Sequence, residues 1–147
     1  MSNNAFRKFV IIFVTLIGAG FGTWAGFLYF PYVWIATILG IISGYVLSRV
    51  YLAILTKIAA KGYGKLKVAL AGAITGALCG LLSTVFIHGI MILLNNIAKW
   101  EDFAKGEGGI ELFIAVLIGC HVVGTLVGLI AGGLCSQFYI LRVMKHD

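Results

Sequence analysis

Residues 68–94 read VALAGAITGALCGLLSTVFIHGIMILL, an apolar run that contains no Asp, Glu, Lys or Arg. A transmembrane helix needs about 20 apolar residues to cross the hydrocarbon core of a bilayer. Three further apolar runs of similar length occur at 9–30, 33–55 and 110–134. We therefore predict four transmembrane helices over these four ranges.

The composition of the whole chain agrees with this prediction. Of its 147 residues, 61% are hydrophobic and only 11% are charged, whereas soluble domains contain about 25% charged residues. These values exclude a soluble domain, a disordered tail and a nucleic-acid-binding module. Continuous apolar runs are also unlike the alternating strands of a membrane barrel. We predict one all-α integral membrane domain over 1–147, with its four helices in an up-down bundle.

The basic residues are distributed unevenly between the two sides of the predicted membrane domain. The net charge is +6, and nine of the eleven Lys and Arg residues lie before the first run, at the end of the second run or just after it, or after the fourth run. The positive-inside rule therefore predicts that both termini are cytoplasmic. We expect a location in the bacterial inner (plasma) membrane. Contact with anionic lipids is expected for one basic group: Arg49, Lys57, Lys61, Lys65 and Lys67.

Two further helical segments are predicted outside the apolar runs. The polar stretch 95–109 carries apolar residues at helical spacing and ends in a Gly-rich sequence, which is typical of a short interfacial helix. After the fourth run, residues 135–147 are predicted to form a cytoplasmic helical tail.

Glycines four residues apart occur in every predicted span. This spacing places them on one face of a helix, and glycines let the backbones of membrane helices approach closely. We therefore predict glycine-zipper packing, either inside the bundle or against another protein or another copy of the chain. The predicted contact residues are Gly18, Gly22, Gly26, Gly40, Gly44, Gly72, Gly76, Gly80, Gly124, Gly128 and Gly132.

The glycine pattern also suggests two duplicated helical hairpins. The residues Gly40, Gly44, Ser48 and Tyr51 of the second span recur at the same spacing in the fourth span, as Gly128, Gly132, Ser136 and Tyr139. In the same comparison, Gly18, Gly22 and Gly26 of the first span correspond to Gly72, Gly76 and Gly80 of the third.

His88 and His121 are the candidate polar site within the spans, whose only Asp or Glu is Glu111 at the start of the fourth run. Both lie within about one helical turn of the same depth. They are expected to meet if their helices face each other there. Hydrogen bonding between helices, a metal or haem site, and a path for a proton or solute are the open interpretations. No metal or other cofactor is expected by default, and haem is the alternative that these two residues leave open.

These observations favour a role in association rather than in catalysis. We expect a small membrane subunit that packs into a larger complex and serves in anchoring, scaffolding or assembly. Its expected partners are the lipid bilayer, other membrane subunits or copies of itself, and no nucleic acid. No catalytic motif occurs, so an enzyme is not expected. The alternatives are an oligomeric channel or transporter with a path near His88 and His121, and a haem- or quinone-associated redox subunit.

Overall fold

The computed structural model describes residues 3–28, 33–96 and 109–142. Within these ranges the chain forms four helices and no strand. The helices are α1 (Asn3–Leu28), α2 (Val33–Ala60), α3 (Lys65–Asn96) and α5 (Gly109–Arg142). All four are long and apolar enough to cross a membrane. The prediction of an all-helical chain with four such helices is therefore confirmed.

The helices extend beyond the apolar runs. Helix α1 begins at Asn3 and helix α2 continues to Ala60, because polar residues at a helix end are compatible with helical backbone in the interfacial region. Residues 135–142 continue helix α5 without a break. The predicted interfacial helix falls almost entirely on residues 97–108, which lie outside the described part of the chain.

A short turn separates α2 from α3. The Lys61 N–H donates to the Ile58 carbonyl oxygen at 3.2 Å, and the Gly62 N–H donates to the Ala59 carbonyl oxygen at 3.1 Å. Gly62 adopts a φ of 70°, the left-handed conformation with which glycine commonly ends a helix. Helix α3 then begins at Lys65, so the end of α2 lies close to the start of α3.

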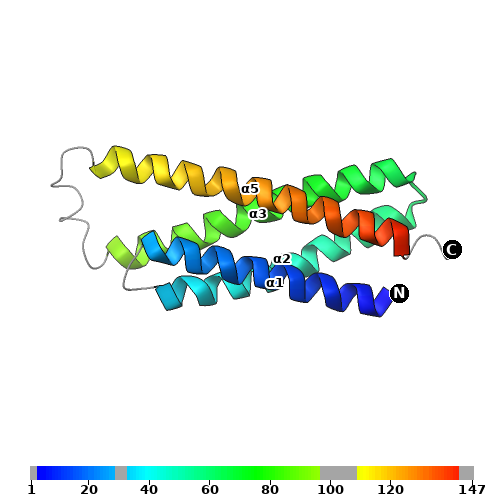
Figure 1. The fold of residues 1–147 in the computed structure, drawn as a ribbon, viewed down its shortest axis with the longest axis horizontal. Coiled ribbons are helices and arrows are strands. Elements are labelled where there is room, and N and C mark those ends of the chain that lie inside the picture. Colours follow the sequence, from blue (N-terminus) through cyan, green and yellow to red (C-terminus); the bar gives the residue numbers. More distant parts are fainter. Residues whose placement is uncertain (1–2, 29–32, 97–108, 143–147) are drawn as a thin grey trace.

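The four helices associate as two hairpins. The most extensive contacts join α1 to α2 and α3 to α5, and the hairpins meet mainly through α2 and α3. Figure 1 shows the N-terminal end of α1 and the C-terminal end of α5 at the same end of the molecule, together with the connection between α2 and α3. The basic residues of these segments therefore gather at one end.

Buried side chains form two clusters between the helices. One contains Phe6 and Val10 of α1 with Tyr51, Leu52 and other residues of α2, α3 and α5. The Phe6 ring packs against Phe138 and Tyr139 of α5, with centroid separations of 6.3 and 5.1 Å. The second cluster contains Ala25, Ala36, Ile87 and Met91. Each cluster contains residues of both hairpins, so the two clusters join the hairpins at two separate places.

Candidate functional site

The glycines of the first hairpin lie where α1 and α2 touch. A Cβ atom added to Gly18 would collide with the carbonyl oxygen of Gly40 and lie 3.0 Å from the Cα of Gly44. One added to Gly22 would collide with the carbonyl oxygen of Ala36. The two backbones are therefore in direct contact, and no larger residue fits between them without a shift of the helices.

The second hairpin repeats this contact. A Cβ atom on Gly76 would collide with the carbonyl oxygen of Gly128 and lie 2.7 Å from the Cα of Gly132. A Cβ atom on Gly80 would collide with the carbonyl oxygen of Gly124. The predicted glycine positions thus face one another inside each hairpin, and in this arrangement they are not available to a partner protein.

These contacts correct the correspondence expected between the first and third spans. Gly18 contacts Gly40 and Gly44, and the residue that makes the equivalent contacts with Gly128 and Gly132 is Gly76, not Gly72. The register therefore differs by one helical turn from the one that the glycine spacing suggested. A four-residue repeat looks the same after a shift of four, so the pattern alone cannot determine the register.

Three glycines of the same helices lie away from the contacts between helices. Around Gly20 of α1, Gly89 of α3 and Gly119 of α5, an added Cβ atom would meet nothing within 4 Å. All three residues are exposed on the outside of the described bundle. The packing inside the molecule therefore gives no reason for a glycine at these positions.

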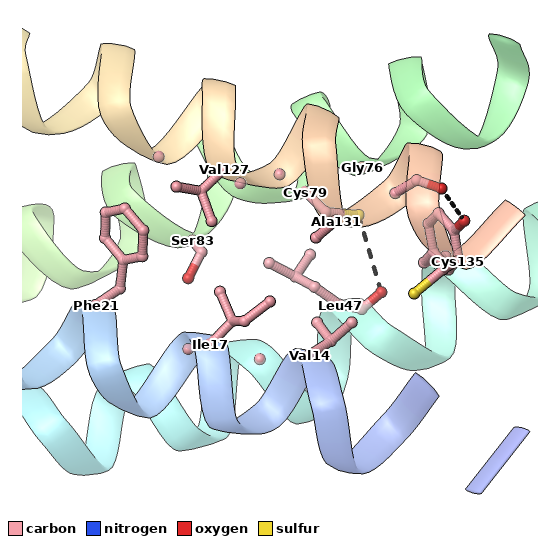
Figure 2. Close-up of a pocket in the computed structure, with 17 residues that line it drawn as sticks. Val14, Ile17, Phe21, Leu47, Gly76, Cys79, Ser83, Val127, Ala131 and Cys135 are labelled. Carbon is pink, nitrogen blue, oxygen red and sulfur yellow. Dashed lines mark hydrogen bonds between the residues drawn. The ribbon is translucent and has the colours of Figure 1, made fainter. Parts of the chain in front are cut away.

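A cavity of about 60 Å³ lies between the two hairpins. Figure 2 shows Ile17, Phe21 and Leu47 approaching it from one hairpin, and Val127 and Ala131 from the other. Its walls are almost entirely apolar, and the glycine contacts of both hairpins border it. Within each hairpin the two helices are in backbone contact, whereas the contacts between the two hairpins are less extensive. The cavity lies in this less closely packed region.

Several hydroxyl groups of the described spans form contacts between helices. Thr23 Oγ1 and Thr37 Oγ1 are 3.0 Å apart across the first hairpin. Ser43 Oγ and Ser83 Oγ are 2.7 Å apart between the hairpins. The Tyr51 hydroxyl donates to the Gly132 carbonyl oxygen. These contacts link the helices, and sequence reasoning did not find them because no spacing rule pairs residues of different helices.

His88 and His121 meet in the second hairpin. Their ring centroids are 5.3 Å apart and the ring planes are inclined by 32°. His88 Nδ1 lies 2.8 Å from the Thr84 carbonyl oxygen, and His121 Nδ1 lies 2.6 Å from the Leu117 carbonyl oxygen. A carbonyl oxygen only accepts, so Nδ1 carries the proton in both rings. The structure thus brings together the two residues whose proximity the sequence left undecided.

Two histidine rings in contact give no support to a haem held between them. A haem with two histidine ligands places its porphyrin plane between the two rings. The rings of His88 and His121 are already adjacent, and α3 and α5 touch at Gly80 and Gly124. Among the described residues, no group of three or more His, Cys, Asp or Glu side chains could hold a metal ion.

The basic group predicted to contact lipid lies at one end of the described molecule. Arg49 Nη2 donates to the Tyr45 hydroxyl at 3.0 Å, and its guanidinium lies 5.4 Å from the centroid of that ring. The Lys67 ammonium lies 5.5 Å from the centroid of the Tyr63 ring. Aromatic and cationic side chains paired in this way are typical of the membrane–water boundary.

Comparison with protein-family models, with curated proteins and with solved structures gives no match. The function must therefore be argued from the contacts of the chain itself.

Proposed function

We propose that the chain is a small integral membrane subunit that associates with other membrane proteins in an anchoring, scaffolding or assembly role. It has no enzymatic activity of its own in this proposal. Its four helices form an up-down bundle in which the glycine contacts close each hairpin as a zipper. Association with partners then uses the outer surface of the bundle.

The outward-facing glycines carry this proposal. Gly20, Gly89 and Gly119 lie on the exposed surface, and nothing lies within 4 Å of a Cβ atom added to them. A glycine inside a helix costs roughly 0.5–1 kcal/mol relative to alanine. Small residues on the surface of a membrane helix allow a second helix to approach closely. A transmembrane helix of a partner subunit is therefore the expected occupant of these positions.

The charge distribution supports an orientation with both termini in the cytoplasm. The start of α1, the end of α2, the start of α3 and the end of α5 lie at one end of the bundle (Figure 1). Basic residues lie in all four segments and in the turn between α2 and α3: Arg7, Lys8, Lys57, Lys61, Lys65, Lys67 and Arg142. This end faces the cytoplasm of a bacterial inner membrane under the positive-inside rule, and its cations contact anionic lipids.

Native mass spectrometry of the chain extracted from its own host in mild detergent tests the proposal. We expect a complex with at least one other membrane protein. Replacement of Gly89 or Gly119 by leucine should remove the partner while the chain itself remains folded. A chain that appears alone and monomeric would contradict the proposal.

Lipid-facing positions on other faces of the same helices provide matched controls. Leu70 of α3 and Ile114 of α5 are 55% and 50% exposed. At 3.6 residues per turn they lie more than a quarter turn around the helix axis from Gly89 and Gly119. Their replacement by phenylalanine adds bulk to a different part of the outer surface, and it should leave the complex intact.

A further inference from the structure

His88 and His121 lie in the second hairpin. The glycine contacts that the two hairpins have in common do not require histidines at these positions. Gly18 and Gly76 make equivalent contacts, as do Gly40 and Gly128. If the same register is continued along the helices, the positions corresponding to His88 and His121 hold Phe30 and Val33. In sequence, the first hairpin therefore has apolar residues at the two positions where the second has histidines.

Both imidazoles present the same nitrogen for binding. Each Nδ1 donates its proton to the carbonyl oxygen four residues earlier in its own helix. This arrangement fixes the tautomer and leaves Nε2 with a lone pair. Histidines that bind metals commonly donate their other ring N–H to a backbone carbonyl in this way. Two neutral rings of the same tautomer cannot donate to each other through Nε2, but both can bind one cation.

The surroundings favour an ion of low charge. His88 is 2% exposed. The only Asp or Glu within the four apolar runs is Glu111, ten residues and therefore about 15 Å along the helix from His121, too far to neutralise an ion bound at the pair. The free energy of moving an ion into a medium of low dielectric constant is large and rises with the square of its charge. Two neutral ligands in such a site therefore suit a monovalent ion better than a divalent one.

From this geometry we propose that His88 and His121 form a binding site for a copper(I) ion. Imidazole binds copper well, and copper(I) accepts two nitrogen ligands, the number that this pair supplies. With metal–nitrogen bonds of about 2.0 Å, ring centres bound to one ion lie at most about 6.4 Å apart, and closer when the angle at the ion is bent. The observed separation of 5.3 Å corresponds to an angle of about 110° at the ion, so a linear two-coordinate ion would require the ring centres to move apart by about 1 Å. This proposal does not depend on the proposed association with other subunits.

Copper(I) binding should be measured on purified protein by competition with a chromophoric copper(I) chelator under reducing, anaerobic conditions. Cys79, Cys120 and Cys135 are free thiols that could bind the ion independently, so the measurement is made in the variant with all three replaced by alanine. We expect one copper(I) per chain, with an affinity that falls more than about tenfold in His88→Gln and in His121→Gln. His146→Gln is the matched control, and it should bind copper(I) normally.

A second measurement uses the unaltered chain and does not depend on the folding of the cysteine-free variant. Nitrogen NMR of the histidine-labelled protein should show two Nδ1–H tautomers. Addition of silver(I), a copper(I) substitute, should shift the Nε2 signals of His88 and His121 together. Unchanged signals would overturn the proposal. Equal copper(I) affinity with and without the two histidines would also overturn it, as would zinc(II) binding at the pair without copper(I) binding.

Discussion

The hydroxyl group of Tyr51, on α2, donates a hydrogen bond of 2.7 Å to the main-chain carbonyl oxygen of Gly132, on α5. Tyr51 is 3% exposed, and this bond connects the two hairpins. Gly132 also lies against the backbone of α3 at Gly76. The same residue therefore makes contacts both within the second hairpin and between the hairpins.

Replacement of Tyr51 by phenylalanine should destabilise the bundle by about 1 kcal/mol, because it removes this hydrogen bond while retaining the ring. Unfolding in mixed micelles of mild detergent and dodecyl sulfate measures the change. Tyr45→Phe is the control, because the Tyr45 ring is 45% exposed and its hydroxyl bonds only to Arg49 among the contacts described. A loss in the control as large as that in Tyr51→Phe would show that the hydrogen bond between hairpins is not the cause.

Alanine at Gly128 should destabilise the protein by about 1–3 kcal/mol, the usual effect of overpacking. The new Cβ would collide with the Gly76 carbonyl oxygen and lie 3.0 Å from the Cα of Gly80. Alanine at Gly89, where the Cβ would meet nothing within 4 Å, should instead stabilise the helix by about 0.5–1 kcal/mol. Opposite signs in the same unfolding assay are the expected result, and equal effects would contradict the glycine contacts.

The hydrogen bond between Ser43 and Ser83 should couple the two hairpins. Ser43 Oγ donates to the Gly40 carbonyl oxygen at 3.1 Å, so Ser83 supplies the proton for the 2.7 Å contact between the two hydroxyls. A double-mutant cycle with Ser43→Ala and Ser83→Ala should give a coupling energy of about 0.6 kcal/mol. Additive effects of the two substitutions would show that the hydroxyls do not interact in the membrane-like environment.

Filling the cavity should stabilise the bundle. Val127 borders the cavity, and Val127→Ile adds one methylene group that can occupy part of the empty space, for a gain of up to about 1 kcal/mol. Val123→Ile makes the same chemical change on the same helix at a residue that is 42% exposed. Stabilisation in the first variant but not in the second is expected in thermal unfolding, and a loss in Val127→Ile would indicate that the cavity closes in the membrane.

Fusions to either terminus test the orientation. Green fluorescent protein should fluoresce at both ends, and alkaline phosphatase should be inactive at both, because the proposed orientation places the basic end of the bundle in the cytoplasm. Replacement of Lys57, Lys61, Lys65 and Lys67 by glutamine should produce a mixed orientation. Lys99→Gln, in the loop predicted on the other side, should not. Phosphatase activity at both termini of the unaltered chain would reverse the proposed orientation.

The sequence predicts the helices well because their main determinant is local. An uncharged run such as 68–94 can satisfy its backbone hydrogen bonds in lipid only as a helix, and it lies within α3. The helix ends are less well predicted, because hydropathy detects the hydrocarbon core and not the helical turns beyond it. Helix α1 therefore begins before Phe9, the first residue of the predicted span.

The contacts between helices could be predicted only in part. Glycine spacing identifies the faces that touch, but a repeat of four cannot distinguish Gly72 from Gly76 as the partner of Gly128. The depth of His88 and His121 suggested that they could be neighbours, whereas their contact depends on the rotation of α3 against α5. Rotation and register arise from packing over whole helices, which no single residue pattern encodes.

The closing of each hairpin on its own glycines has a consequence for how the chain is assembled. Each half contains the partners for its closest backbone contacts, so it can complete them before the other half has entered the bilayer. The hairpin, rather than the single helix, is then the unit of membrane insertion. A polypeptide severed at Tyr63 would leave two such units, and the fragments could rejoin through α2 and α3 without rebuilding either one.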